Sequence, residues 1–151
     1  MVRYNQVVAN ILLLPNFLTY YEGELIAARS DGKIHSSVEK QLRDLPGITE
    51  HRFNQLQEIE ALLNYLNMQH RKTRQVHYKK YLEGYGKALT SRDAQVYAEA
   101  EDDVINSDVL INEVALLRNK FLGILKAIEA KNFQLGHITR LRTAGLEDIA
   151  V

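Results

Sequence analysis

The stretch Leu56-Gln-Glu-Ile-Glu-Ala-Leu-Leu-Asn-Tyr-Leu66 indicates the fold class of this 151-residue chain. Four apolar residues recur in it at alternating steps of three and four, namely Leu56, Ile59, Leu63 and Leu66. This spacing is typical of a helix that packs lengthwise against another helix. Continued in register, the stripe reaches His70, Thr73 and His77, so it is predicted to turn polar there.

A second apolar stripe of the same spacing lies nearer the C-terminus. Its members are Leu110, Val114, Leu117, Phe121, Ile124 and Ile128, and Ile111 and Leu125 widen it. Two helices of roughly 30 residues would each be about 45 Å long, and a small monomer is not expected to cover stripes of that length. We therefore predict an all-α fold, a long antiparallel helical hairpin with short flanking helices, assembled into a ring-like homo-oligomer.

The chain is predicted to form a single helical domain over 1–151, whose first segment, 1–48, holds short helices. Ser36 is followed three residues later by Glu39, which is a capping-box pattern. The helix that it starts is predicted to end before Pro46, because a proline disfavours helical backbone at the residue before it.

The second segment, 49–92, is predicted to be one long helix that Thr49 caps and that nearby glycines interrupt. The third segment, 93–151, begins with an acidic helix that Thr90 or Ser91 opens. The long C-terminal helix with the second stripe follows it.

Lys131-Asn132 is predicted to close that C-terminal helix, and a short helix follows over 134–142. Three apolar residues on one side of the short helix suit docking on an adjacent subunit: Leu135, Ile138 and Leu141. These three and the six members of the second stripe are the predicted oligomerisation residues.

Composition excludes several kinds of chemistry. The chain has no cysteine, which removes disulfides, thiolate zinc sites and thiol nucleophiles, and this fits a reducing cytoplasm.

The apolar run Val7 to Leu14 is too short to span a bilayer, so a buried element or a subunit contact is favoured over a signal peptide.

No catalytic or metal-binding pattern is evident, so we expect no enzyme, no cofactor and no metal. The five histidines never occur at the i, i+4 spacing of a helical metal pair. Four crowded acids resemble a hard-metal site: Glu99, Glu101, Asp102 and Asp103. No liganding loop with a turn glycine accompanies them, so a solvated face or a salt-bridge surface for a neighbouring basic block is favoured.

The formal net charge of zero hides two adjoining blocks of opposite charge. The basic block, Gln69 to Arg92, holds seven Lys/Arg and one acid, Glu83. The acidic block, Asp93 to Glu113, holds seven Asp/Glu and no Lys or Arg. A groove or a partner responds to such local charge rather than to the net charge.

Within the basic block, five residues follow steps of three and four and so share one helix face: Arg71, Arg74, Tyr78, Tyr81 and Tyr85. Lys72, Lys79 and Lys80 flank this face. Cations neutralise phosphates and aromatic rings stack on bases, so the face is a candidate track for single-stranded nucleic acid. The alternative is that the tyrosines pack against a neighbouring helix while the cations are solvated or pair with acids elsewhere.

Two stretches of the C-terminal third are specific enough to compare with known families: Ala115-Leu-Leu-Arg-Asn-Lys-Phe-Leu-Gly-Ile-Leu-Lys-Ala-Ile-Glu and Phe133-Gln-Leu-Gly-His-Ile-Thr-Arg-Leu-Arg-Thr-Ala-Gly-Leu-Glu. They resemble the end of the UvsY family of recombination mediators from large tailed bacteriophages. The resemblance covers most of the chain and is clearest after Asn54. The stretch Tyr78-Lys-Lys-Tyr-Leu-Glu-Gly-Tyr-Gly-Lys-Ala-Leu-Thr-Ser-Arg-Asp and the opening Arg3-Tyr-Asn-Gln-Val-Val resemble the marine-phage branch of that family.

The resemblance implies a small protein that binds single-stranded DNA and assembles into a ring, a heptamer in the best-known member. It implies that the protein binds strands coated by the phage single-strand-binding protein and loads the phage RecA-like recombinase there. The family's DNA contacts centre on a Lys-x-Arg pair followed by Asp-Tyr. Lys72-Thr73-Arg74 matches the pair, whereas Val76 and His77 stand at the Asp-Tyr positions and Tyr78 is displaced by one.

These sequence features leave three hypotheses for the function. The leading hypothesis is a non-enzymatic mediator in recombination-dependent replication and repair, located in the cytoplasm of the infected bacterial host and not in a membrane. The alternative is a helical adaptor or structural oligomer whose charged blocks pair between subunits. A nuclease or other enzyme is disfavoured because the metal-ligand pattern is missing.

Overall fold

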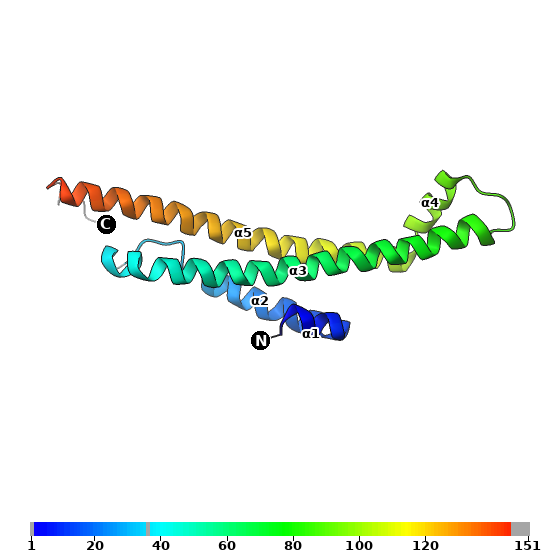
Figure 1. The fold of residues 1–151 in the computed structure, drawn as a ribbon, viewed down its shortest axis with the longest axis horizontal. Helices are drawn as coiled ribbons and strands as arrows, with labels where there is room; N and C mark the ends of the chain where they lie inside the picture. The colour runs from blue at the N-terminus through cyan, green and yellow to red at the C-terminus, as the bar shows by residue number, and fades with distance from the viewer. Residues whose placement is uncertain (1, 36, 146–151) are drawn as a thin grey trace.

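The computed structural model describes residues 2–35 and 37–145, and every regular element in them is helical. The elements are α1 (Tyr4–Ala9), the 3-10 helix η1 (Ile11–Leu13), α2 (Leu14–Ala28), α3 (Val38–Gly84), α4 (Ser91–Glu99) and α5 (Asp102–Thr143). Helices α3 and α5 form a long antiparallel hairpin, α1 and α2 lie along its middle, and α4 lies at the end where α3 finishes (Figure 1). The prediction of an all-helical fold is confirmed.

The core lies where α2, α3 and α5 meet. The predicted stripe of α3 is buried there, with exposed fractions of 0–8% for its four members. Tyr21 of α2 packs between Phe17 and Phe121, with ring centroids 4.5 and 6.0 Å away. Burial raises the pKa of Tyr21, whose hydroxyl has no hydrogen-bond partner among the described residues. The tyrosine therefore contributes mainly through apolar packing.

Helix α3 is longer than predicted, because Pro46 lies inside it and does not end it. Ser37 is the N-cap, with its Oγ accepting a hydrogen bond from Lys40 N at 3.5 Å, whereas Ser36 lies outside the described residues. The prediction that Thr49 caps a new helix is wrong, because its hydroxyl donates to the Leu45 carbonyl within α3. Burial of Leu45 anchors the turn next to the proline, which offsets the hydrogen bond that Pro46 cannot donate.

Helix α5 is also continuous, so the predicted break at Lys131-Asn132 is wrong. Lys131 is only 3% exposed, and its ammonium donates to the Asp31 carbonyl at 3.0 Å. A charged residue that suggested a helix end is therefore held inside the molecule by the loop between α2 and α3. Helix α5 ends only at Thr143, before Gly145 with a φ of 77°.

The buried part of the second stripe is covered within one chain. Five of the nine predicted oligomerisation residues are 0–3% exposed: Val114, Leu117, Phe121, Ile128 and Leu135. Ile124 and Ile138 are half-buried, whereas Leu110 and Leu141 are 36% and 37% exposed. The premise that one chain cannot cover this stripe is therefore wrong for its buried members.

The N-terminal apolar run forms a buried element in part. Val7 is fully buried and Leu14 nearly so, whereas Leu12 between them is 79% exposed. Among the described residues, no helix combines the length and the hydropathy that crossing a membrane requires.

Candidate nucleic-acid interface

Beyond Leu66 the end of α3 extends past the core, and α4 turns back onto it at an angle (Figure 1). Thr90 caps α4, since its Oγ1 accepts a hydrogen bond from Asp93 N at 3.2 Å, as predicted for Thr90 or Ser91. Ala94 and Ala98 are fully buried on α4, and their small side chains let it approach α3 closely. We call this unit, the part of α3 beyond Leu66 together with α4, the distal arm.

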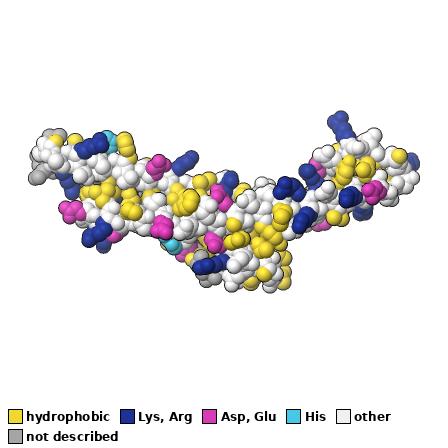
Figure 2. Space-filling model, in the orientation of Figure 1, with side chains coloured by type: hydrophobic (Ala, Val, Ile, Leu, Met, Phe, Trp, Pro, Cys, Tyr) yellow, Lys and Arg dark blue, Asp and Glu magenta, His cyan; other side chains and the backbone are white. Residues whose placement is uncertain are grey.

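A groove of about 570 Å³ runs between α3 and α4 in the distal arm. Its lining is rich in hydrogen-bond donors and consists of Arg71, Arg74, Gln75, Tyr78, Ser91, Arg92, Gln95 and Ala98. Figure 2 shows Lys and Arg side chains gathered around this end of the molecule. Guanidinium groups bind phosphate in planar, paired geometry, so a groove lined by three arginines is a candidate site for an anion.

The predicted helix face divides between two environments. Arg71, Arg74 and Tyr78 line the groove as expected. Tyr81 and Tyr85 instead stack on Tyr97 of α4, with ring centroids 5.4 and 6.1 Å away and interplanar angles of 30° and 19°. Tyr81 and Tyr85 therefore contact a neighbouring helix, which is the packing part of the alternative.

The tyrosine cluster still offers open aromatic surface, because Tyr85 and Tyr97 are 50% and 46% exposed. The sequence prediction missed Tyr97, since it lies inside the acidic block. It counted Arg92 in the basic block without placing it on the predicted face, and it missed Gln95; both reach the groove because α4 turns back onto α3. The signal that was available was the spacing of Ala94 and Ala98, which marks the α4 face that packs on α3.

The basic and acidic blocks pair with each other inside the chain. Arg74 Nη1 lies 3.5 Å from Glu99 Oε1, and Lys80 Nζ lies 3.4 Å from Glu101 Oε1. The Tyr81 hydroxyl donates to Glu101 at 2.7 Å, and this hydrogen bond is the main reason that the pKa of Glu101 is lowered. The same bond is the main reason that the pKa of Tyr81 is raised.

Two histidines connect the distal arm to the start of α5, where the stripe of α3 was predicted to turn polar. His70 Nδ1 lies 2.7 Å from Ser107 Oγ, and its Nε2 lies 3.5 Å from Asp108 Oδ1. His77 Nε2 lies 2.9 Å from Asp103 Oδ2, and a hydrogen bond from His77 is the main cause of a lowered pKa of Asp103. Polar contacts therefore continue the hairpin beyond the apolar core.

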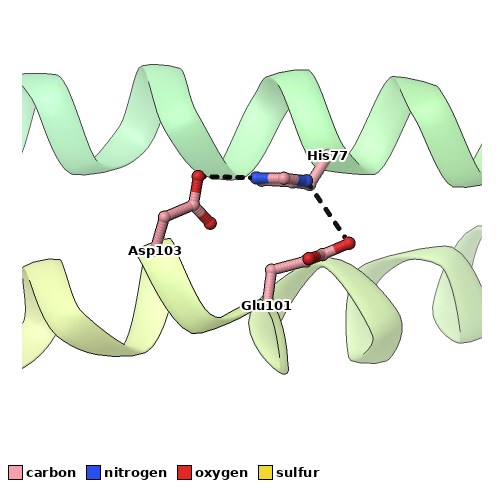
Figure 3. A group of neighbouring side chains, drawn as sticks. All are labelled: His77, Glu101 and Asp103. Carbon is pink, nitrogen blue, oxygen red and sulfur yellow. Dashed lines mark hydrogen bonds and ion pairs between the residues drawn. The ribbon is translucent and has the colours of Figure 1, made fainter.

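The group of His77, Glu101 and Asp103 brings possible metal ligands within 4.8 Å of one another (Figure 3). However, Asp103 faces one ring nitrogen of His77 while Glu101 faces the other, at 3.5 Å from Nδ1. One ion can bind only one of these nitrogens, and the Lys80 ammonium already lies beside Glu101. The geometry fits an imidazole held between two carboxylates better than a metal centre.

The remaining predicted cations lie outside the groove. Lys72 and Lys79 are exposed, one heptad apart, and neither has an ion pair within the described part of the chain. Of the Lys72-Thr73-Arg74 motif, only Arg74 lines the groove, because residues two apart on a helix point in different directions. The intervening Thr73 hydroxyl donates to the Gln69 carbonyl within α3.

Comparisons of the chain with protein-family models, with curated proteins and with solved structures find no match. The function is therefore inferred from the groove and from the patterns in the sequence.

Proposed function

We propose that this protein is a recombination mediator that binds single-stranded DNA through the distal arm. In this proposal it helps to load a phage RecA-like recombinase onto strands coated by the phage single-strand-binding protein, in the cytoplasm of an infected bacterium. It acts without enzymatic chemistry, as a ring-like homo-oligomer, a heptamer by its resemblance to the UvsY family.

The observation that carries the proposal is the groove lined by Arg71, Arg74 and Arg92, in a distal arm that also holds the half-exposed rings of Tyr85 and Tyr97. Arginines neutralise backbone phosphates regardless of sequence. In this proposal unpaired bases stack on the exposed parts of Tyr85 and Tyr97, and stacking tolerates every base because every base has a π-face. Bases can stack in this way only where they are unpaired, so single strands are favoured over duplex.

Assembly of several subunits would strengthen binding to DNA even where a single groove binds weakly. A long strand that contacts several grooves binds each further one at a raised effective concentration. This is why a mediator built from small basic arms gains from assembly into a ring. The resemblance to the UvsY family supports the loading step and names its two protein partners.

The DNA-binding step is tested by fluorescence anisotropy of a labelled oligothymidylate titrated with protein at several salt concentrations. Binding to single strands should weaken steeply with salt, by about 0.7 in the slope of log affinity against log salt for each phosphate neutralised. Replacing Arg71 and Arg92 by Ala should weaken binding on the order of tenfold and reduce the slope by about 1.4. An affinity that does not change with salt would contradict the proposal.

The matched control replaces Arg140 and Arg142, which lie in the last turn of α5, away from α4 (Figure 1). This variant removes the same charge and should bind nearly as the wild type does. If it loses binding while the groove variant retains it, the DNA site lies at the C-terminal end of α5. The loading step is tested separately, by whether the protein shortens the lag of a RecA-like recombinase on strands coated with single-strand-binding protein.

The alternative function, an adaptor whose charged blocks pair between subunits, makes a different prediction. It needs acids and bases that are free to pair with a neighbour, whereas Arg74 and Lys80 have acidic partners in their own chain. An oligomer that dissociates in moderate salt and never binds DNA would favour this alternative.

A further inference from the structure

Glu99 lies at the edge of the arginine groove. It is the last residue of α4, and its Oε1 lies 3.5 Å from Arg74 Nη1. The same oxygen accepts a hydrogen bond from Gln95 Nε2 at 3.0 Å. Arg74 and Gln95 both line the groove, so one carboxylate contacts two of the donors that a bound anion would use.

A carboxylate held by a guanidinium and an amide makes the same kind of contact that a backbone phosphate makes. The Glu99 and Arg74 side chains are 46% and 45% exposed, so water and salt screen their pair. Such a pair breaks at little cost. A phosphate that displaces Glu99 would therefore recover a charge-assisted contact with Arg74 at a small penalty.

The Glu99 pair is not what holds α4 in place. Ala94 and Ala98 bury α4 against α3, and Tyr97 stacks on Tyr81. The next acid along the chain, Glu101, is fixed separately by the Tyr81 hydroxyl. Removal of the charge at Glu99 should therefore leave the groove formed.

We propose that Glu99 is an internal competitor for the phosphate site of the groove and lowers the affinity of this protein for single-stranded DNA. The proposal rests on the proposed function and assigns a role to one member of the acidic block. In the free protein Glu99 holds Arg74, and in the complex a phosphate replaces it. A mediator benefits from such moderated affinity, because it must give up the strand after the recombinase is loaded.

The test compares Glu99→Gln with Glu83→Gln in the anisotropy titration described above. Glu83 is exposed in the last turn of α3 and has no ion pair among the described residues, so its change removes the same charge without freeing a groove arginine. Glu99→Gln should bind oligothymidylate roughly two- to fivefold more tightly than wild type at low salt, which is the range that an exposed ion pair spans. Glu83→Gln should show a smaller gain.

A double-mutant cycle with Arg74→Ala assigns the effect to the pair. In the Arg74→Ala background, Glu99→Gln should gain no more affinity than Glu83→Gln does, because no guanidinium remains to be freed. If wild type binds DNA but Glu99→Gln binds no tighter than Glu83→Gln, the competitor role is wrong and the proposed function stands. If wild type and both glutamine variants all fail to bind, the proposed function is wrong and this inference is wrong with it.

Discussion

Gly32 lies where the loop between α2 and α3 touches α5, and the contact leaves no room for a side chain. A Cβ at this position would lie 2.9 Å from the Ala127 Cβ, which is fixed to the helix backbone and cannot rotate away. Gly32→Ala should therefore lower the free energy of unfolding by about 1–3 kcal/mol, the usual cost of overpacking. Urea denaturation at fixed protein concentration measures this change.

The control is Gly23→Ala in the middle of α2, where an added Cβ meets no atom within 4 Å. This substitution should stabilise the protein by about 0.5–1 kcal/mol, because alanine is the better helix former. Equal effects of the two changes would show that the loop does not pack on α5 as described.

At the scale of single residues, a buried polar network is the feature that the sequence alone could not predict. Arg52 is 8% exposed and donates to Asp31 at 2.7 Å and to Glu24 at 2.9 Å. Gln55 donates to the same Glu24 oxygen at 2.6 Å, which is the main cause of a lowered pKa of Glu24. Arg52 lies one step of four before Leu56 on the stripe of α3, but its polarity gave no sign of burial. The burial of Arg52 and Gln55 depends on acids more than 20 positions away in the chain.

The two carboxylates next to His77 have lowered pKa values for different reasons: a hydrogen bond from Tyr81 for Glu101, and one from His77 for Asp103. The lowered pKa values of Asp103 and Glu101 mean that their contacts stabilise the distal arm above the ordinary carboxyl range, near pH 4, and are lost as pH falls through the lowered values. His77→Gln should raise the titration midpoint of Asp103, measured by carbon-13 NMR of the carboxyl groups. Glu101 should change little, because Tyr81 is its main hydrogen-bond donor.

Tyr81→Phe is the reciprocal variant. It should raise the midpoint of Glu101 toward the ordinary value and leave that of Asp103 nearly unchanged. If each variant moves both midpoints equally, the two carboxylates act as one coupled group and the separate assignments are incorrect.

At the scale of elements, apolar spacing predicted the two long helices. The residues that were taken as signals of helix ends led to wrong predictions of where these helices begin and end. The stripe from Leu56 to Leu66 and its polar continuation at His70 and His77 lie against α5 as the spacing predicts. Pro46 and Lys131 gave false helix ends, because tertiary contacts decide whether a helix continues through an unfavourable residue. Such contacts have no local signal in the sequence.

The continuity of α5 can be tested at Asn132, an exposed residue within the predicted break. Asn132→Pro should lower the free energy of unfolding by about 3 kcal/mol or more, since proline removes a helical hydrogen bond and clashes with the preceding turn. Asn132→Ala is the matched control and should have a small or favourable effect. Tolerance of the proline, with unchanged helical circular dichroism, would instead show two helices that meet at this point.

At the scale of the whole molecule, the separation of charge decides where the candidate site lies. The apolar core occupies the middle of the hairpin, and the acidic and basic blocks meet in the distal arm. The sequence placed Arg71 and Arg74 on one helix face, and both line the groove. The groove itself was not predictable, because Arg92 joins it only through the return of α4.

The proposed assembly would have to use apolar surface that the folded chain leaves exposed. Ile105, Val109 and Leu116 follow steps of four and seven on α5, so they share one face. They are 47%, 51% and 56% exposed, unlike the buried members of the second stripe. If the protein forms the proposed homo-oligomer, this face offers a helix-length contact to a second copy. Replacing all three by Ser should leave helical circular dichroism unchanged and yield smaller species in sedimentation velocity.

The control for this last prediction is Val76→Ser with Val96→Ser, two exposed apolar residues of the distal arm at 66% and 59% exposure. These changes remove exposed apolar side chains away from the α5 face and should leave the sedimenting species unchanged. Smaller assemblies should also bind long strands less tightly, since linked sites can gain on the order of a hundredfold in avidity. An unchanged oligomer in the triple variant would place the subunit contact elsewhere, with the exposed Leu12 in η1 as the next position to test.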